Sequence, residues 1–248
     1  MQEVQQARDE LAIEQVKAIR MKQPRVGGKK IHRMLLNLCM PELKIGRDYL
    51  FGLLQERNML AKVKKRYIRT TDSSHKLSKY PNLMANVTIT KPNQAWVVDI
   101  TYLRTYEGFA YLFLVTDYYS RKILSHLVSD TLHAGGAIKA LKKALRLATP
   151  PAGLIHHSDH GCQYYSKDYQ KLLEENNLLV SMTGPNHCYD NAVAERINGI
   201  LKQEFGLGKL LPDHAVARQA VEEAINIYNC ERLHLSLNYR TPEFVYAA

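Results

Sequence analysis

The sequence predicts an α/β protein, with a mixed sheet flanked by helices, preceded by a small domain that is helical throughout. Two features of the hydrophobic pattern predict this fold class. From residue 95 onward, three strand-like runs follow one another with only turn residues between them, and helices then alternate with strands. Before residue 60, apolar residues recur every three or four positions, which is the period of amphipathic helices.

Three helices are predicted in the N-terminal part, at 3–22, 28–39 and 46–58. Proline and glycine interrupt the pattern between them, and the third helix places Tyr49 among its inward-facing residues. Short helices joined by tight turns suit a helix-turn-helix bundle, so residues 1–60 are expected to be a DNA-binding domain. A helical subdomain that only packs against the rest of the chain is the alternative.

The positive charge of the chain is concentrated ahead of the strands. Residues 1–93 hold 19 Lys and Arg against 8 Asp and Glu, whereas residues 94–248 hold 15 against 16. A basic linker is predicted over 61–93, and five of its side chains are expected to contact DNA phosphates: Lys62, Lys64, Lys65, Arg66 and Arg69. This asymmetry indicates a DNA-binding module joined to a second module, with a solvated basic surface as the alternative.

The second module is predicted to cover residues 94–248. Its first strands are expected at 95–104, 109–118 and 121–128. Because only turn residues lie between them, the three strands are expected to pair antiparallel as successive hairpins. The elements expected after them are a helix at 134–148, a strand at 153–157, a helix at 166–176, a strand at 178–182, a helix carrying Glu195 and a last helix at 213–230.

Three acids in this module stand in unusual surroundings. Asp99 interrupts an apolar strand-like run, Asp159 follows another such run at the start of a loop, and Glu195 lies in a segment of helical character. Buried charges are rare unless they are paired or bind a metal, and three neighbouring acids would repel one another. A divalent cation removes that conflict, and oxygen-only ligands favour Mg²⁺ or Mn²⁺.

Two motifs surround the second and third acids, and a further motif lies near the end of the chain. They are His157-Ser158-Asp159-x-Gly161-x-Gln163-Tyr164-x-Ser166, Asp190-Asn191-Ala192-x-x-Glu195 and Tyr228-Asn229-x-x-Arg232-x-His234-x-Ser236-Leu237-x-x-x-Thr241-Pro242. Between Asp159 and Glu195 lie 35 residues. In order, spacing and surroundings the chain resembles the DDE catalytic core of retroviral integrases and bacterial insertion-sequence transposases, although it departs from common family members at His160 and Cys162.

The resemblance implies a ribonuclease-H-like fold and a DDE transposase, a polynucleotidyl transferase. Asp99, Asp159 and Glu195 would be its catalytic residues and the ligands of two Mg²⁺ or Mn²⁺ ions. The implied partners are DNA, both the element's terminal repeats and the target, and further copies of the chain on that DNA. A helix-turn-helix protein encoded in an upstream reading frame is a further implied partner, either as a separate protein or as a fusion in which this chain would follow it. A ribonuclease-H-like nuclease without transposition activity and a DNA-binding regulator are the alternatives.

Two further residues are predicted to touch DNA. Lys202 follows Glu195 by seven residues, which is two helical turns, so it shares the face of Glu195 about 10 Å along the axis and is expected to hold a phosphate. The alternative is a solvated lysine. His157 precedes Asp159 by two residues and would orient that acid or contact DNA, with a structural histidine equally open. For Arg232 the sequence does not choose between DNA contact and fixing the C-terminal segment.

Other classes of protein are disfavoured. No apolar run approaches the roughly 20 residues that span a bilayer, and the N-terminus has no signal-peptide core. The four cysteines are scattered without paired spacing, which argues for reduced thiols and against a cysteine zinc site. With the bacterial resemblance, we expect a cytoplasmic, nucleoid-associated protein.

Overall fold

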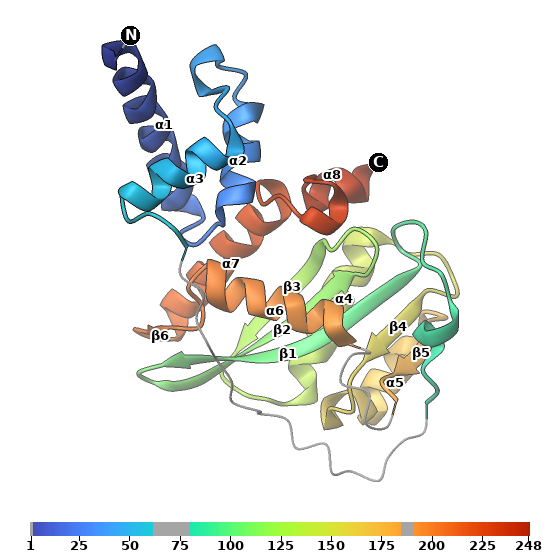
Figure 1. Ribbon diagram of the computed structural model, residues 1–248. Coiled ribbons are helices and arrows are strands. Elements are labelled where there is room, and N and C mark those ends of the chain that lie inside the picture. Colours follow the sequence, from blue (N-terminus) through green and yellow to red (C-terminus); the bar gives the residue numbers. More distant parts are fainter. Residues whose placement is uncertain (1, 62–79, 185–190) are drawn as a thin grey trace. The chain divides into compact units, whose positions relative to one another are not determined.

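A computed structural model describes residues 2–61, 80–184 and 191–248 (Figure 1). The chain divides into two compact units. One comprises Met1–Arg69 with Leu233–Tyr239, and the other comprises Thr70–Arg232 with Arg240–Ala248. Within the described ranges, no helix combines the length and apolar character needed to cross a bilayer.

The first unit is a three-helix bundle. Its helices are α1 (Gln2–Lys22), α2 (Gly28–Asn37) and α3 (Arg47–Glu56), close to the predicted ranges. Their apolar faces meet in one core, made of Ala12, Ile13, Val16, Val26, Ile31, Leu35, Leu43, Ile45, Leu50, Leu53 and Leu54. The prediction that Tyr49 faces inward is wrong: the side chain is 46% exposed, because its polar hydroxyl donates to the Asp9 carboxylate at 2.8 Å at the surface of the bundle.

The second unit is built on a mixed sheet, as predicted. Its first three strands, β1 (Ala95–Thr105), β2 (Gly108–Asp117) and β3 (Ile123–Ser129), pair antiparallel as successive hairpins. The strands β4 (Ile155–Ser158) and β5 (Leu179–Met182) then add in parallel on the other side of β1. The strand order is β3-β2-β1-β4-β5, so β1 is central.

A sixth strand was not predicted. The two-residue strand β6 (Leu210–Leu211) pairs in parallel with Arg104 and Thr105 at the far end of β1. Since β4 pairs with β1 only from Ala95 to Val97, the edge of β1 between these two partners has no ladder partner among the described residues. Asp99 lies on this open stretch.

Helices cover both faces of the sheet (Figure 1). The helices α4 (Ala134–Ala148) and α5 (Lys167–Glu175) lie on one face, where Trp96 and Val98 of β1 enter their core. The helices α6 (Ala192–Glu204) and α7 (His214–Cys230) cover the other face, which receives Leu103. Side chains alternate along a strand, so Asp99 points to the face of α6 and α7.

The end of α7 anchors the sheet. Asn229 holds Ile123 at the start of β3 through both of its amide atoms, at 3.0 and 2.9 Å, and the Tyr228 hydroxyl donates to the Arg121 carbonyl at 2.9 Å. The short helix α8 (Pro242–Ala247) follows, capped by the Thr241 side chain. The C-terminal motif that the sequence singled out therefore contributes to packing.

Candidate active site

The sheet register brings the first two acids together. Parallel pairing of β1 with β4 aligns Trp96 with His156 and Val97 with His157. Continuing this register by two residues places Asp159 level with Asp99. The ladder ends before this point, but the charge of Asp159 acts on the carboxyl of Asp99, so the two acids lie near each other although 59 residues separate them in the sequence.

Asp99 is half-buried and held by two donors. Its Oδ1 accepts the Ile100 backbone N–H at 2.9 Å, and its Oδ2 accepts the Asn198 Nδ2 at 2.6 Å. Burial, together with the negative charges of Asp159 and Glu195, raises the pKa of Asp99 to about 7, against the lowering effect of both hydrogen bonds. The carboxylate therefore lies in an environment that favours an added positive charge.

Asp159 sits in a tight turn directly after β4. Its Oδ1 accepts the Gly161 N–H at 2.9 Å, and burial raises its pKa. A Cβ on Gly161 would lie 3.1 Å from this oxygen, so the close approach favours glycine. Behind the turn, Gln163 donates to the Leu132 carbonyl at 2.9 Å and Tyr164 is buried in the core, which fixes the backbone that carries Asp159.

Glu195 is presented by α6. Ile197 and Leu201 of this helix are buried, which fixes the helix on the sheet, while Glu195 itself is exposed. Burial of its carboxyl and the charge of Asp159 both raise its pKa. Within the described ranges, no three His, Cys, Asp or Glu side chains are close enough to hold a metal ion as they stand. The residues 185–190, which lead into α6, are outside those ranges.

Sequence reasoning missed Asn198. Its side chain is buried, and its Nδ2 makes the 2.6 Å bond to Asp99, whereas its buried Oδ1 has no partner in the described part of the chain. The signal was available, since Asn198 follows Glu195 by three residues and so shares its helical face. An amide at that position can link the helix to the central strand.

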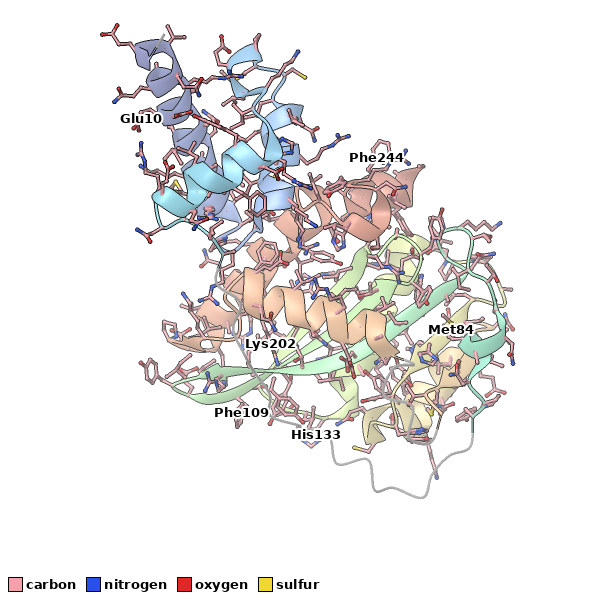
Figure 2. The ribbon with its side chains drawn as sticks, viewed as in Figure 1. Glu10, Met84, Phe109, His133, Lys202 and Phe244 are labelled. Atoms are coloured by element: carbon pink, nitrogen blue, oxygen red, sulfur yellow. The ribbon has the colours of Figure 1, made fainter. Side chains whose placement is uncertain are left out.

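Lys202, labelled in Figure 2, lies on α6 two helical turns after Glu195 and so on the same helix face. Burial lowers its pKa, the negative charge of Asp99 raises it, and the positive charge of Arg104 lowers it. The ammonium group is therefore half-buried within electrostatic reach of Asp99. Such an environment differs from that of a freely solvated lysine.

Two other candidate residues, His157 and Arg232, are buried and bonded within the protein. His157 is fully buried and its Nδ1 lies 2.8 Å from the Ser181 Oγ, which favours the structural alternative over DNA contact. Arg232 is 2% exposed and its guanidinium donates twice to the Glu204 carboxylate, at 2.9 and 2.8 Å. The linker residues predicted to contact phosphates, Lys62, Lys64, Lys65, Arg66 and Arg69, lie outside the described residues.

The donor set fits a hard divalent cation. Asp99, Asp159 and Glu195 offer only oxygen, which Mg²⁺ and Mn²⁺ prefer. Burial raises the pKa of each of the three, and the negative charge of Asp159 also raises the pKa values of Asp99 and Glu195. A bound cation would reverse these shifts, because it stabilises the ionised form of every ligand.

Two family models match the chain. Both are described as "Integrase core domain"; one covers residues 89–188 and the other residues 176–242. Together these ranges contain all three acids, Asn198 and Lys202.

Curated bacterial proteins are similar over most of the chain. An uncharacterized 31 kDa protein of insertion element IS600 from Shigella sonnei is 38% identical over 213 residues, which is 85% of this chain and 78% of that protein. The transposase for insertion sequence element IS629 from Shigella sonnei is 31% identical, covering 87% and 72%. Transposase InsF for IS3A from Escherichia coli K12 is 35% identical, covering 77% and 67%.

Solved structures share the fold. The catalytic core domain of HTLV-2 integrase in complex with magnesium matches with a TM-score of 0.52 and 21% identity, over 63% of this chain and 97% of that one. A simian T-cell lymphotropic virus intasome with a PP2A regulatory subunit matches with a TM-score of 0.56 and 17% identity, over 91% and 72%. The fold is therefore the ribonuclease-H-like fold of integrase cores, with a helical region ahead of it.

Proposed function

This chain belongs to the insertion-sequence transposases that carry an integrase core domain, and we propose that Asp99, Asp159 and Glu195 are its catalytic, metal-binding residues. The activity is DNA transposition by a DDE polynucleotidyl transferase. The observation that supports the residue assignment best is the β1–β4 pairing, because β4 ends directly before Asp159 and runs beside the strand that carries Asp99, whose pKa the charge of Asp159 raises.

The proposed reaction has two in-line displacements at phosphorus. Water first attacks one strand at the end of the element, so that a P–O bond to water forms and the bond to the 3′-oxygen breaks. The freed 3′-hydroxyl then attacks a target phosphodiester, and the leaving 3′-oxygen of the target takes up a proton. Neither step needs an oxidant or a covalent protein intermediate.

The three carboxylates would hold the cofactor, Mg²⁺ or Mn²⁺, with two ions in our proposal. The integrase core family is metal-dependent. When bound, divalent ions neutralise charge on the attacked phosphate and favour ionisation of the attacking oxygen. The protein's own part is to orient the ligands, and the bond from Asn198 fixes one oxygen of Asp99 for this purpose.

Lys202 is proposed to hold a DNA phosphate beside the carboxylates. Its half-buried ammonium lies on the helix face that carries Glu195 and Asn198. A point charge at this place can attract a phosphate without carrying sequence information. The base-reading residues are not assigned.

The proposed partners are the terminal repeats of the element, target DNA and further copies of the chain, since two ends must be joined. An upstream-frame helix-turn-helix protein, or a fusion to it, stays a prediction. The similar curated proteins come from bacteria, which supports a site of action on DNA in the bacterial cytoplasm, at the nucleoid.

A strand-transfer assay with the element's own ends tests the proposal. In Mg²⁺ or Mn²⁺, Asp99→Asn is expected to lower product formation at least 1,000-fold, about 4 kcal/mol in the barrier, while DNA binding persists. The matched control is Asp168→Asn, an exposed carboxylate on α5. Full strand transfer by Asp99→Asn would refute the site and support a regulator, whereas cleavage without preference for the terminal repeats would support a general nuclease.

A further inference from the structure

The hairpin of β1 and β2 carries three aromatic rings that the proposed reaction does not use. The rings of Tyr102 and Tyr111, which pair across the strands, lie 5.3 Å apart at 66°, and those of Tyr102 and Phe109 lie 6.0 Å apart at 82°. Phe109 is 53% exposed and Tyr102 36% exposed. Edge-to-face packing fixes the rings in place and still leaves aromatic surface open to solvent. We call these three residues the aromatic platform.

The platform begins on the open edge of β1. Tyr102 follows Asp99 by three residues, about 10 Å along the strand, and since side chains alternate it lies on the other face of the sheet, the face of α4 and α5. Burial raises the pKa of Tyr102, and so do Tyr111 and the negative charge of Asp159, which follows β4 on the same edge of β1. A DNA strand that crosses this open edge from the carboxylates would reach the platform.

One cation stands directly beside the platform. Arg104 is exposed and stands on the same face of β1 as Tyr102, two residues further on. Its guanidinium donates to the Gly208 carbonyl at 3.3 Å, and its charge also acts on Lys202. Glu107, the acid of the hairpin turn, instead accepts the backbone N–H of His214 at 2.9 Å. Exposed rings beside a cation are complementary to nucleotides, which combine a flat base with a charged phosphate.

We propose that Tyr102, Phe109 and Tyr111 form a stacking platform for unpaired nucleotides of the DNA strand held at Asp99 and Asp159. Bases inside a duplex cannot stack on a protein ring, whereas unpaired bases expose both faces. The proposal rests on the proposed function, which makes DNA the substrate. A base pair at a strand end opens at a lower cost than one inside a duplex, and the platform would hold the unpaired bases of such an end.

Binding of the full chain to two fluorescent probes tests the proposal. One probe is a blunt duplex, and the other is the same duplex extended by a short unpaired tail, both in EDTA. Phe109→Ala is expected to weaken binding of the tailed duplex about fivefold or more and to leave the blunt duplex within about twofold. Phe109→Trp should retain the affinity. The matched control is Phe244→Ala on α8, because Phe244 is 57% exposed and is labelled with Phe109 in Figure 2.

Several outcomes would overturn the proposal. One is equal affinity of the unsubstituted chain for both probes, and another is a Phe109→Ala variant that loses affinity equally for both. Sedimentation without DNA is the third test, since dissociation of oligomers by Phe109→Ala would make the rings a contact between copies. Failure of the proposed function is distinguishable, because it shows as undiminished strand transfer by Asp99→Asn or as no DNA binding at all.

Discussion

At the scale of single residues, Asp99 carries an electrostatic conflict. Two hydrogen bonds favour its ionised form, but burial and two neighbouring acids oppose ionisation more strongly and bring its pKa to about 7. Near neutral pH, Asp99 would therefore be protonated in some of the molecules, and binding of a divalent cation to those molecules would release a proton. The residue was recognisable in the sequence because a lone acid in an apolar strand needs a compensating charge.

Asn198 should matter for turnover more than for DNA binding. Asn198→Ala removes the 2.6 Å bond to Asp99 and leaves the carboxylate free to rotate. Loss of a hydrogen bond to a charged group corresponds to about 1.5–3 kcal/mol, so we expect a 10- to 100-fold lower rate of strand transfer. Single-turnover rates at saturating DNA, together with DNA affinity by anisotropy, measure the two effects separately.

The matched control is Asn226→Ala, which truncates an exposed asparagine on α7 and should leave the rate unchanged. A loss of DNA affinity with an unchanged rate in Asn198→Ala would show that the amide serves the DNA and not the carboxylate.

At the scale of elements, the period of the hydrophobic pattern located nearly every helix and strand of the core. The strands β1 to β5 and the helices α4, α5 and α7 begin and end within a few residues of the predicted ranges, and α6 is the helix that was predicted to carry Glu195. The pattern could not show β6, since two residues have no period and the strand exists only through pairing with Arg104 and Thr105. It also placed Asn198 on the right helix face without revealing its partner, because the contact depends on how α6 lies on β1.

The C-terminal end of α6 is held by a buried ion pair. Arg232 donates to both carboxylate oxygens of Glu204, and the two side chains are 2% and 18% exposed. Removing one partner leaves a buried charge uncompensated, so Arg232→Ala is expected to lower the free energy of unfolding by about 3 kcal/mol. Urea denaturation followed by circular dichroism measures this value.

The comparison is with an exposed ion pair. Lys171 and Glu175 are 3.8 Å apart on α5 and largely exposed, so Lys171→Ala should change the free energy by less than about 0.5 kcal/mol. If both substitutions cost the same, the pair of Arg232 and Glu204 does not stabilise the end of α6. Since α6 presents Glu195, a frayed end would also loosen the candidate site.

At the scale of the whole molecule, charge and chemistry are divided along the chain. Residues 1–93 carry the excess of positive charge, and the three acids all lie in the near-neutral remainder. A domain boundary near residue 60 followed by a basic linker stays a prediction, because 62–79 are outside the described residues. The division nevertheless predicts that affinity for DNA and catalysis respond to different substitutions.

The salt dependence of DNA binding tests this division. Each phosphate contact contributes about 0.9 to the slope of log affinity against log salt concentration. Replacing Lys64, Lys65 and Arg66 by alanine should therefore lower the slope by about 2 to 3, while metal-dependent strand transfer at saturating DNA persists. The matched control replaces Lys142, Lys143 and Arg146, two lysines and one arginine exposed on α4, and should leave the slope unchanged. Equal changes in both variants would mean that the basic segment acts only through the net charge of the molecule, because contacts with phosphates depend on where the charges lie.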